Sequence, residues 1–176
     1  MISMNFAKLP PLSLPPGAEI RTYAHGDEAL WVKLLDENGE LGRWNIERAE
    51  RAFTGPQRVL RESLHFLWYD GAPVATACVQ RHDKWPDLPE LGWVAVLPSH
   101  RGRGFGREVS LAVMHFMKRH GYERCFLRTS DRRLPAIRLY RKLGFAPDLE
   151  SHPTFPKRWN AVFQKLNERS SDTTLA

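Results

Sequence analysis

An apolar stripe at helical spacing is the clearest structural signal along the chain. Its residues recur three and four positions apart, on one face of a helix: Val109, Ala112, Val113, Phe116 and Met117. Gly121 follows, and glycine often lies just past a helix end because it adopts the left-handed conformation without a steric cost. The pattern predicts a helix that begins after a glycine-rich loop and ends before Gly121.

Alternating and β-branched runs predict a series of strands. Two of them, at 64–69 and 73–80, flank Asp70-Gly71, a dipeptide that favours the tight turn of a hairpin. Further strands are expected at 19–24, 91–97, 125–129, 145–149 and 159–166.

Three shorter helices are predicted beside these strands. One covers 27–35, and a second covers 45–53 with Asn45 as its N-cap. The third covers 135–143, with proline in its first turn and Gly144 just past its end. The resulting order of elements predicts an α/β domain with a mixed sheet.

Length and composition set the domain organisation that we expect. The 176 residues are 42% hydrophobic, enough for one domain that folds without disulfides or a structural metal. We expect a Pro-rich N-terminal arm at 1–18, extended over 9–17, a single domain at 19–166 and a disordered polar tail at 167–176.

The sequence shows neither the apolar runs of a membrane protein nor the residue pattern of a metal site. No apolar run reaches the ~18 residues that a membrane-spanning helix needs, and the N-terminus does not resemble a secretory signal. Cys78 and Cys125 lie inside apolar runs, where we expect small buried side chains. These observations favour a cytoplasmic protein without a metal.

Positive charge is concentrated in one segment. The chain carries a formal net charge of +6, and residues 101–142 hold 12 basic and 3 acidic residues. Such an excess indicates an anionic partner: nucleic acid, an acidic membrane surface or a phosphorylated small molecule. No nucleic-acid-binding motif accompanies the basic residues, so nucleic acid is not expected as the primary partner.

The loop at 101–106 can carry anion-binding chemistry. A predicted strand ends, three alternate glycines follow, and a helix begins. Backbone N–H groups in such a loop add to the positive end of the helix dipole, an arrangement that suits a phosphate or pyrophosphate. Neither a Walker A loop nor a Rossmann fingerprint matches this string.

Two motifs make the chain similar to a known family. Arg101-x-x-Gly104-x-Gly106 resembles the acyl-CoA signature of the GNAT acetyltransferase superfamily. The string from Ala136 through Tyr140 to Gly144-Phe145 resembles the A-x-x-x-Y-x-x-x-G-F helix of the same family. The resemblance covers roughly 19–166 and is strongest over 90–147. It implies a GNAT-like α/β fold, with a mixed, mostly antiparallel central sheet, two splayed parallel strands and flanking helices.

The resemblance also implies a co-substrate and its binding residues. Acetyl-CoA would lie between the strands at 91–97 and 125–129, with its pyrophosphate on the glycine loop and its pantetheine arm beside the first strand. The residues implied are Val94, Ala95, Val96, Arg101, Gly102, Arg103, Gly104, Phe105, Gly106, Arg107 and Ala136.

Two residues match the catalytic positions of the family. Tyr140 would protonate the departing thiolate, although a tyrosine there can also simply fill the buried face of its helix. Glu90 would take the proton from the acceptor amine, or it is a solvated carboxylate, with His82 or Asp83 acting through water instead. Strand alternation predicts that Glu90, Gly92, Val94 and Val96 share one face.

One position departs from the family pattern. Many members place asparagine after the strand that precedes the tyrosine helix, whereas this chain has Thr129-Ser130-Asp131 there. Either Thr129 or Asp131 would have to make the hydrogen bonds that the asparagine side chain makes in those members. An ionised aspartate accepts hydrogen bonds but cannot donate them.

These implications favour an N-acetyltransferase that moves an acetyl group to a primary amine by direct attack on the thioester. The alternatives are an acyl-CoA-binding sensor without catalysis and a nucleic-acid-binding module. The acceptor would be a small-molecule or peptide amine, no membrane partner is expected, and a homodimer is left open. Aromatic residues that could form walls of the acceptor site are Trp31, Trp44, Trp85, Trp93, Trp159 and Phe155.

Overall fold

The computed structural model describes residues 2–172, and their contacts concentrate within two units. The N-terminal unit is Asn5–Cys125; the C-terminal unit starts at Phe126 and includes the first residues of the chain up to Met4. Among the described helices, none combines the length and the apolar character needed to cross a bilayer.

An antiparallel sheet forms the centre of the N-terminal unit. Its strand order is β2-β4-β5-β6, and β3 pairs with the end of β5. The strands are β2 (Ala18–Thr22), β3 (Gln57–Val59), β4 (His65–Tyr69), β5 (Ala72–His82) and β6 (Trp85–Val96). Asp70 and Gly71 both have positive φ, 50° and 79°, which confirms the predicted hairpin between β4 and β5.

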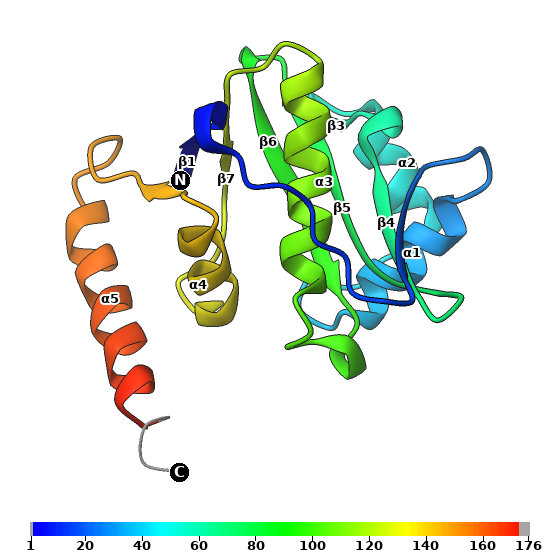
Figure 1. Ribbon diagram of the computed structural model, residues 1–176. Helices are drawn as coiled ribbons and strands as arrows, with labels where there is room; N and C mark the ends of the chain where they lie inside the picture. The colour runs from blue at the N-terminus through cyan, green and yellow to red at the C-terminus, as the bar shows by residue number, and fades with distance from the viewer. Residues whose placement is uncertain (1, 173–176) are drawn as a thin grey trace. The chain divides into compact units, whose positions relative to one another are not determined.

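Helices cover both faces of this sheet (Figure 1). On one side lie α1 (Glu28–Glu37) and α2 (Ile46–Thr54), and on the other lies α3 (Phe105–Arg119). Asn45 caps α2 as predicted, because its side chain accepts a hydrogen bond from the Arg48 amide at 2.9 Å. Short 3₁₀ helices are η1 (Phe6–Lys8), η2 (Arg61–Ser63) and η3 (Pro98–His100).

The Pro-rich segment at 9–17 lies along α3 and ends in a turn at Pro16-Gly17. His115 Nε2 is 2.8 Å from the carbonyl oxygen of Pro10, and the Ser13 amide donates to Glu108 Oε2 at 2.7 Å. Glu108 is buried beneath this segment. The hydrogen bonds attach the arm to the helix that begins at the glycine loop.

The chain passes from β6 through α3 into β7 (Arg124–Leu127), whose first residues still belong to the N-terminal unit. β7 follows β6 in the strand order and runs parallel to it, as expected for two strands joined by a helical crossover. The other pairings in this unit are antiparallel. The predicted α/β fold with a mixed, mostly antiparallel sheet and flanking helices is therefore confirmed.

The C-terminal unit contains two helices and a small strand pair. β1 (Ile2–Asn5) pairs antiparallel with β8 (Ala146–Pro147). The helices are α4 (Leu134–Lys142) and α5 (Phe155–Asp172). Gly144 has φ of 98° just past the end of α4, as the sequence predicts.

The strand predicted at 159–166 is wrong, because α5 occupies that segment. Trp159, Val162 and Leu166 recur at helical spacing and pack, with Phe163, against Leu134 and Ile137 of α4. The disorder predicted from residue 167 is also wrong as far as Asp172, where α5 ends. The remainder of that predicted tail lies outside the described residues.

Strand alternation fails in the middle of β6. Thr76 pairs with Ala95 and Cys78 pairs with Gly92, so two steps on β5 oppose three on β6. The extra residue is a β-bulge, and it moves Ala95 onto the face that Glu90 and Gly92 occupy. Val96, which pairs with Ala75, lies on the opposite face. The prediction that Val96 shares a face with Glu90 is therefore wrong.

Candidate functional site

The glycine loop leads into the first turn of α3 with open space around it. Gly102 and Gly104 have φ of 81° and 83°, and a Cβ at either position would meet nothing within 4 Å. Gly104 is the N-cap, and its carbonyl oxygen accepts from the amides of Arg107 and Glu108. The first amides of a helix otherwise lack intrahelical partners, so this end of α3 fits an anion such as the CoA pyrophosphate.

The arginines around the loop differ in their partners. Arg101 donates to the Asn38 carbonyl oxygen at 2.6 Å and pairs with Glu40 at 3.1 Å. Arg107 pairs with Glu108. Arg103 lies over the Tyr69 ring, 5.6 Å from its centroid. Acidic groups thus balance part of the positive charge that the sequence places around the loop.

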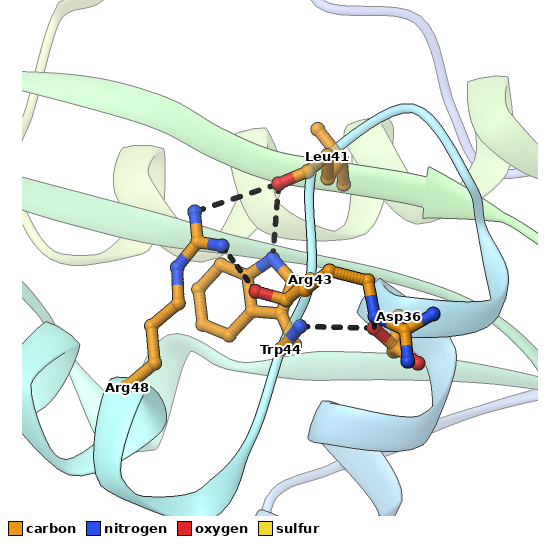
Figure 2. Close-up of polar contacts among 5 residues, drawn as sticks. All are labelled: Asp36, Leu41, Arg43, Trp44 and Arg48. Atoms are coloured by element: carbon orange, nitrogen blue, oxygen red, sulfur yellow. Dashed lines mark hydrogen bonds and ion pairs between the residues drawn. The ribbon is translucent and has the colours of Figure 1, made fainter.

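The segment between α1 and α2 is held by hydrogen bonds to side chains of both helices and by one from its own Trp44. Trp44 donates from its amide to Asp36 Oδ1 at 2.9 Å and from Nε1 to the Leu41 carbonyl at 3.2 Å. Figure 2 shows Arg48 reaching the carbonyls of Leu41 and Arg43, with its guanidinium 4.2 Å from the Trp44 ring centroid. Asn38 ties the start of this segment to β6, because its side-chain amide donates to the Val96 carbonyl at 2.9 Å.

The bulge of β6 carries an unusual backbone conformation. Trp93 has φ of 49°, a region that bulky residues rarely adopt. Its indole packs edge-on against Trp44 at 4.6 Å between ring centroids. Trp93 thereby joins an aromatic cluster under α1 and α2 that includes Trp31 and Phe53. Trp31, Trp44 and Trp93 therefore lie in one cluster; they are three of the six aromatic residues expected to line the acceptor site.

A buried acid–base pair lies on the same face of the sheet. His82 Nε2 and Glu90 Oε2 are 2.7 Å apart, and their side chains are only 3% and 5% exposed. Burial, with the charge of Glu90 as a smaller cause, raises the pKa of the nearby Cys78 thiol well above its usual range. Asp83, the other predicted alternative, is exposed and pairs with Arg58 at 2.6 Å instead.

Tyr140 belongs to the C-terminal unit. It is buried on α4, where its ring packs edge-on against Phe145 at 5.9 Å. Burial raises the pKa of its phenol to about 12, against a smaller opposing effect of Arg133. The phenol therefore stays protonated at neutral pH, as a proton donor requires. Ala136, one helical turn before Tyr140, is partly exposed.

A cavity of about 220 Å³ lies within the C-terminal unit. Asp131 forms one side of it through a two-pronged pair with Arg158, with both distances at 2.9 Å. Sequence reasoning missed Arg158, which lay in a segment expected to precede a strand. Phe155 and Trp159, both expected as acceptor walls, line this cavity. Its other lining residues are Arg128, Thr129, Ile137 and Val162.

The predicted site residues divide between the two units. Glu90, His82, the residues at 94–96 and the loop at 101–107 belong to the N-terminal unit, whereas Ala136 and Tyr140 belong to the C-terminal unit. Sequence reasoning missed Gln80, Asn38 and Glu40. Gln80 could have been found from strand alternation, since it lies two positions from His82 on the same strand.

Comparisons with known proteins agree with these features. The acetyltransferase (GNAT) family profile matches residues 21–145. A mycothiol acetyltransferase from Thermomonospora curvata is 31% identical over 148 aligned residues, covering 78% of this chain and 47% of the relative. The chain spans about half the length of the curated mycothiol acetyltransferases that it matches.

Solved structures share the fold. A GCN5-related N-acetyltransferase from Sphaerobacter thermophilus has a TM-score of 0.68 at 23% identity, covering 82% of this chain and 46% of that one. A diaminobutyrate acetyltransferase from Paenibacillus lautus, in complex with L-2,4-diaminobutyric acid and coenzyme A, has a TM-score of 0.59 at 18% identity, covering 71% and 73%. The family match extends over more than half of the chain and includes both the glycine loop and the Tyr140 helix, so the chain belongs to the GNAT acetyltransferase family.

Proposed function

We propose that the protein is an acetyl-CoA-dependent N-acetyltransferase that acts on a primary amine. The observation that carries the proposal is the glycine loop at the N-terminus of α3, whose left-handed glycines leave open space beside the amides that begin the helix. This is the feature that the family uses to hold an acyl-CoA pyrophosphate. It stands in a chain whose family match extends across residues 21–145.

The residues of this chain divide the work of binding. The amides at 102–106 hold the pyrophosphate, and the backbone of Val94, Ala95 and Val96 holds the pantetheine arm along the edge of β6 that does not pair with β5. Ala136 is the position on α4 that the family motif assigns to the co-substrate. Acetyl-CoA supplies the activated acetyl group, and the chain supplies orientation and proton transfer.

Two side chains move the protons of the reaction. Glu90 accepts a proton from the acceptor ammonium, which leaves a neutral amine with a lone pair for attack on the thioester carbon. A C–N bond forms as the C–S bond breaks, and Tyr140 gives its proton to the departing thiolate. The second proton that the nitrogen loses restores the Tyr140 phenol, so the products are the amide, the free thiol of CoA and protonated Glu90. The raised pKa of Tyr140 keeps that proton in place until the thiolate forms.

The acceptor is proposed as a small-molecule amine. The relatives are named for mycothiol, and one structural neighbour holds L-2,4-diaminobutyric acid. The aromatic cluster under α1 and α2 offers apolar surface and ring faces, which suit an amine carried on an apolar body.

Binding is tested by a matched pair of glycine variants. Gly104 and Gly121 lie just outside opposite ends of α3, with φ of 83° and 84°, and a Cβ at either position would have no neighbour within 4 Å. Alanine costs about the same backbone strain at either position, roughly 1 kcal/mol. We expect Gly104→Ala to weaken acetyl-CoA binding about tenfold by calorimetry and Gly121→Ala to leave it unchanged. Equal affinities of the two variants for acetyl-CoA would show that the glycine loop does not bind the co-substrate.

Turnover is tested by release of free thiol from acetyl-CoA across a panel of primary amines. We expect Tyr140→Phe to lower kcat by about 10²–10⁴ while the affinity for CoA stays the same. Binding of acetyl-CoA without thiol release on any amine would instead support a sensor without catalysis. Salt-sensitive binding to RNA without acetyl-CoA binding would favour a nucleic-acid-binding module.

A further inference from the structure

We propose that His82 is the positioning residue of Glu90: by donating from Nε2 it fixes the carboxylate on the sheet face under α1 and α2, in the orientation in which Glu90 takes the proton of the acceptor amine. This inference rests on the proposed acetyltransferase function. It changes the role of His82 from an alternative base to a residue that acts through Glu90.

The first argument is the contact itself. The Nε2–Oε2 distance of 2.7 Å is that of a strong, charge-assisted hydrogen bond, and both side chains are almost wholly buried. An ionised carboxylate can only accept, so in that state Nε2 of His82 must carry the hydrogen. The contact therefore selects one tautomer of the imidazole and one orientation of the carboxylate.

The second argument is the backbone around Glu90. Only Glu90, Leu91 and Gly92 of β6 pair regularly with β5 in this region. Toward the N-terminus, His82 pairs with Trp85, so two steps on β5 oppose five on β6. Toward the C-terminus lies the bulge at Trp93. Irregularities on both sides re-aim a short strand segment, which is how sheets commonly direct a functional side chain.

A third observation is the neighbour opposite Glu90. Gln80 pairs with Glu90 across the strands, and its side chain lies so close to Gly92 that a Cβ there would collide with Gln80 Oε1. Glycine at position 92 thus makes room for a buried polar side chain next to the acid–base pair. Gln80, His82 and Glu90 form a buried polar row at neighbouring positions of β5 and β6.

Proton counting gives the row a chemical role. With Glu90 ionised and His82 neutral, the pair carries one negative charge. When the N–H bond of the acceptor ammonium breaks and its proton joins the free oxygen of Glu90, the pair becomes a neutral carboxyl group beside a neutral imidazole that still donates from Nε2. Loss of buried charge favours this step in a low-dielectric site.

The test compares two buried histidines of the same unit. His65 is as buried as His82 but lies on the opposite face, where its Nδ1 contacts the Ser63 carbonyl and its ring lies against Phe116. We expect His82→Leu to lower kcat for a primary alkylamine about 10²-fold with little change in the KM for acetyl-CoA. His82→Gln, whose amide can still donate to Glu90, should recover part of the loss. His65→Gln should leave kcat unchanged.

An acceptor of low basicity separates positioning from folding. An alkoxyamine is already a free base at neutral pH and needs no proton removal before attack. We expect His82→Leu to lower its kcat by less than tenfold. Equal losses for alkylamine and alkoxyamine, or no loss with either, would overturn the proposal. If wild-type protein transfers acetyl groups to neither amine, the proposed function fails, and melting temperatures of the variants show separately whether they fold.

Discussion

The two faces of the N-terminal sheet follow the rules of β-structure to different degrees. Under α3, residues such as Ala75, Val79 and Leu91 are apolar, and the buried His65 contacts a backbone carbonyl. Under α1 and α2, β6 carries a bulge with a left-handed tryptophan and a buried acid–base pair.

Unpaired polar atoms follow the same division. Among the described residues, the buried side-chain atoms without a hydrogen-bond partner are Trp31 Nε1, Thr76 Oγ1 and Trp93 Nε1. Trp31 and Trp93 belong to the cluster under α1 and α2, and Thr76 pairs with Phe66 and Ala95, two other members of it. Strain and unsatisfied groups gather on this one face, which supports the proposal that it carries the chemistry, since proteins tolerate them chiefly at functional sites.

The largest difference in activity between the two faces is expected for substitutions at two neighbouring residues of β6. Glu90→Gln removes the proposed base from one face and should lower kcat/KM for the acceptor by about 10²–10⁴. Leu91→Met changes the next residue, on the α3 face, with nearly conserved volume and should leave kcat/KM within about twofold. Steady-state kinetics on both variants measures the contrast. Comparable losses would mean that the faces do not differ in function.

The fold could be predicted from the sequence where local signals agree. The α3 stripe, the Asp70-Gly71 hairpin and the Asn45 cap each have a short-range cause, and each is confirmed. The apolar residues at 159–166 predict a strand, but α5 occupies the segment, because Trp159, Val162 and Leu166 recur at helical spacing. The helical conformation of residues 155–172 is stabilised by packing against α4, which the local sequence does not report.

The candidate site was predictable in its residue types but not in its contacts. The two motifs predict Tyr140 and the glycine loop because they are local strings, and the position of Glu90 at the start of a strand predicts its role as base. The β6 bulge has no local signal: Trp93 is a residue that rarely adopts positive φ, and only pairing with β5 reveals the shift. The pairing of Arg101 with Glu40 joins distant segments, which strand and helix patterns do not report.

The next largest effect concerns the space that Gly92 provides. Gly92→Ala forces Gln80 to move and should lower the free energy of unfolding by about 1–3 kcal/mol. In a Gln80→Ala background the obstacle is gone, and the same substitution should instead stabilise the strand by about 0.5–1 kcal/mol. Urea unfolding of the four proteins gives the double-mutant cycle. An equal cost in both backgrounds would show that Gln80 is not the obstacle.

A smaller effect is expected from the unpaired hydroxyl of Thr76. Thr76→Val replaces a buried oxygen that has no partner among the described residues with a methyl group, and should raise stability by about 1 kcal/mol. Ser63→Ala is the contrast, because Ser63 Oγ donates to the Leu60 carbonyl and accepts from the Val79 amide. That variant should lose about 1–3 kcal/mol. A destabilised Thr76→Val would show that the hydroxyl is satisfied.

The smallest effect tests the α3 face by pH. Burial lowers the pKa of His65 below its unfolded value of 6.5, with the Arg119 charge adding to the effect and the Ser63 carbonyl opposing it. Below that value the unfolded chain binds a proton that the folded chain does not, so stability is complete above pH 6.5 and falls as the pH drops toward the folded pKa. Urea midpoints of wild type and His65→Gln should run parallel above about pH 6.5 and diverge below it, with wild type losing more. Parallel curves throughout would mean that His65 can gain a proton in the folded state as readily as in the unfolded chain, and the α3 face would then lack the dry packing that distinguishes it from the other face.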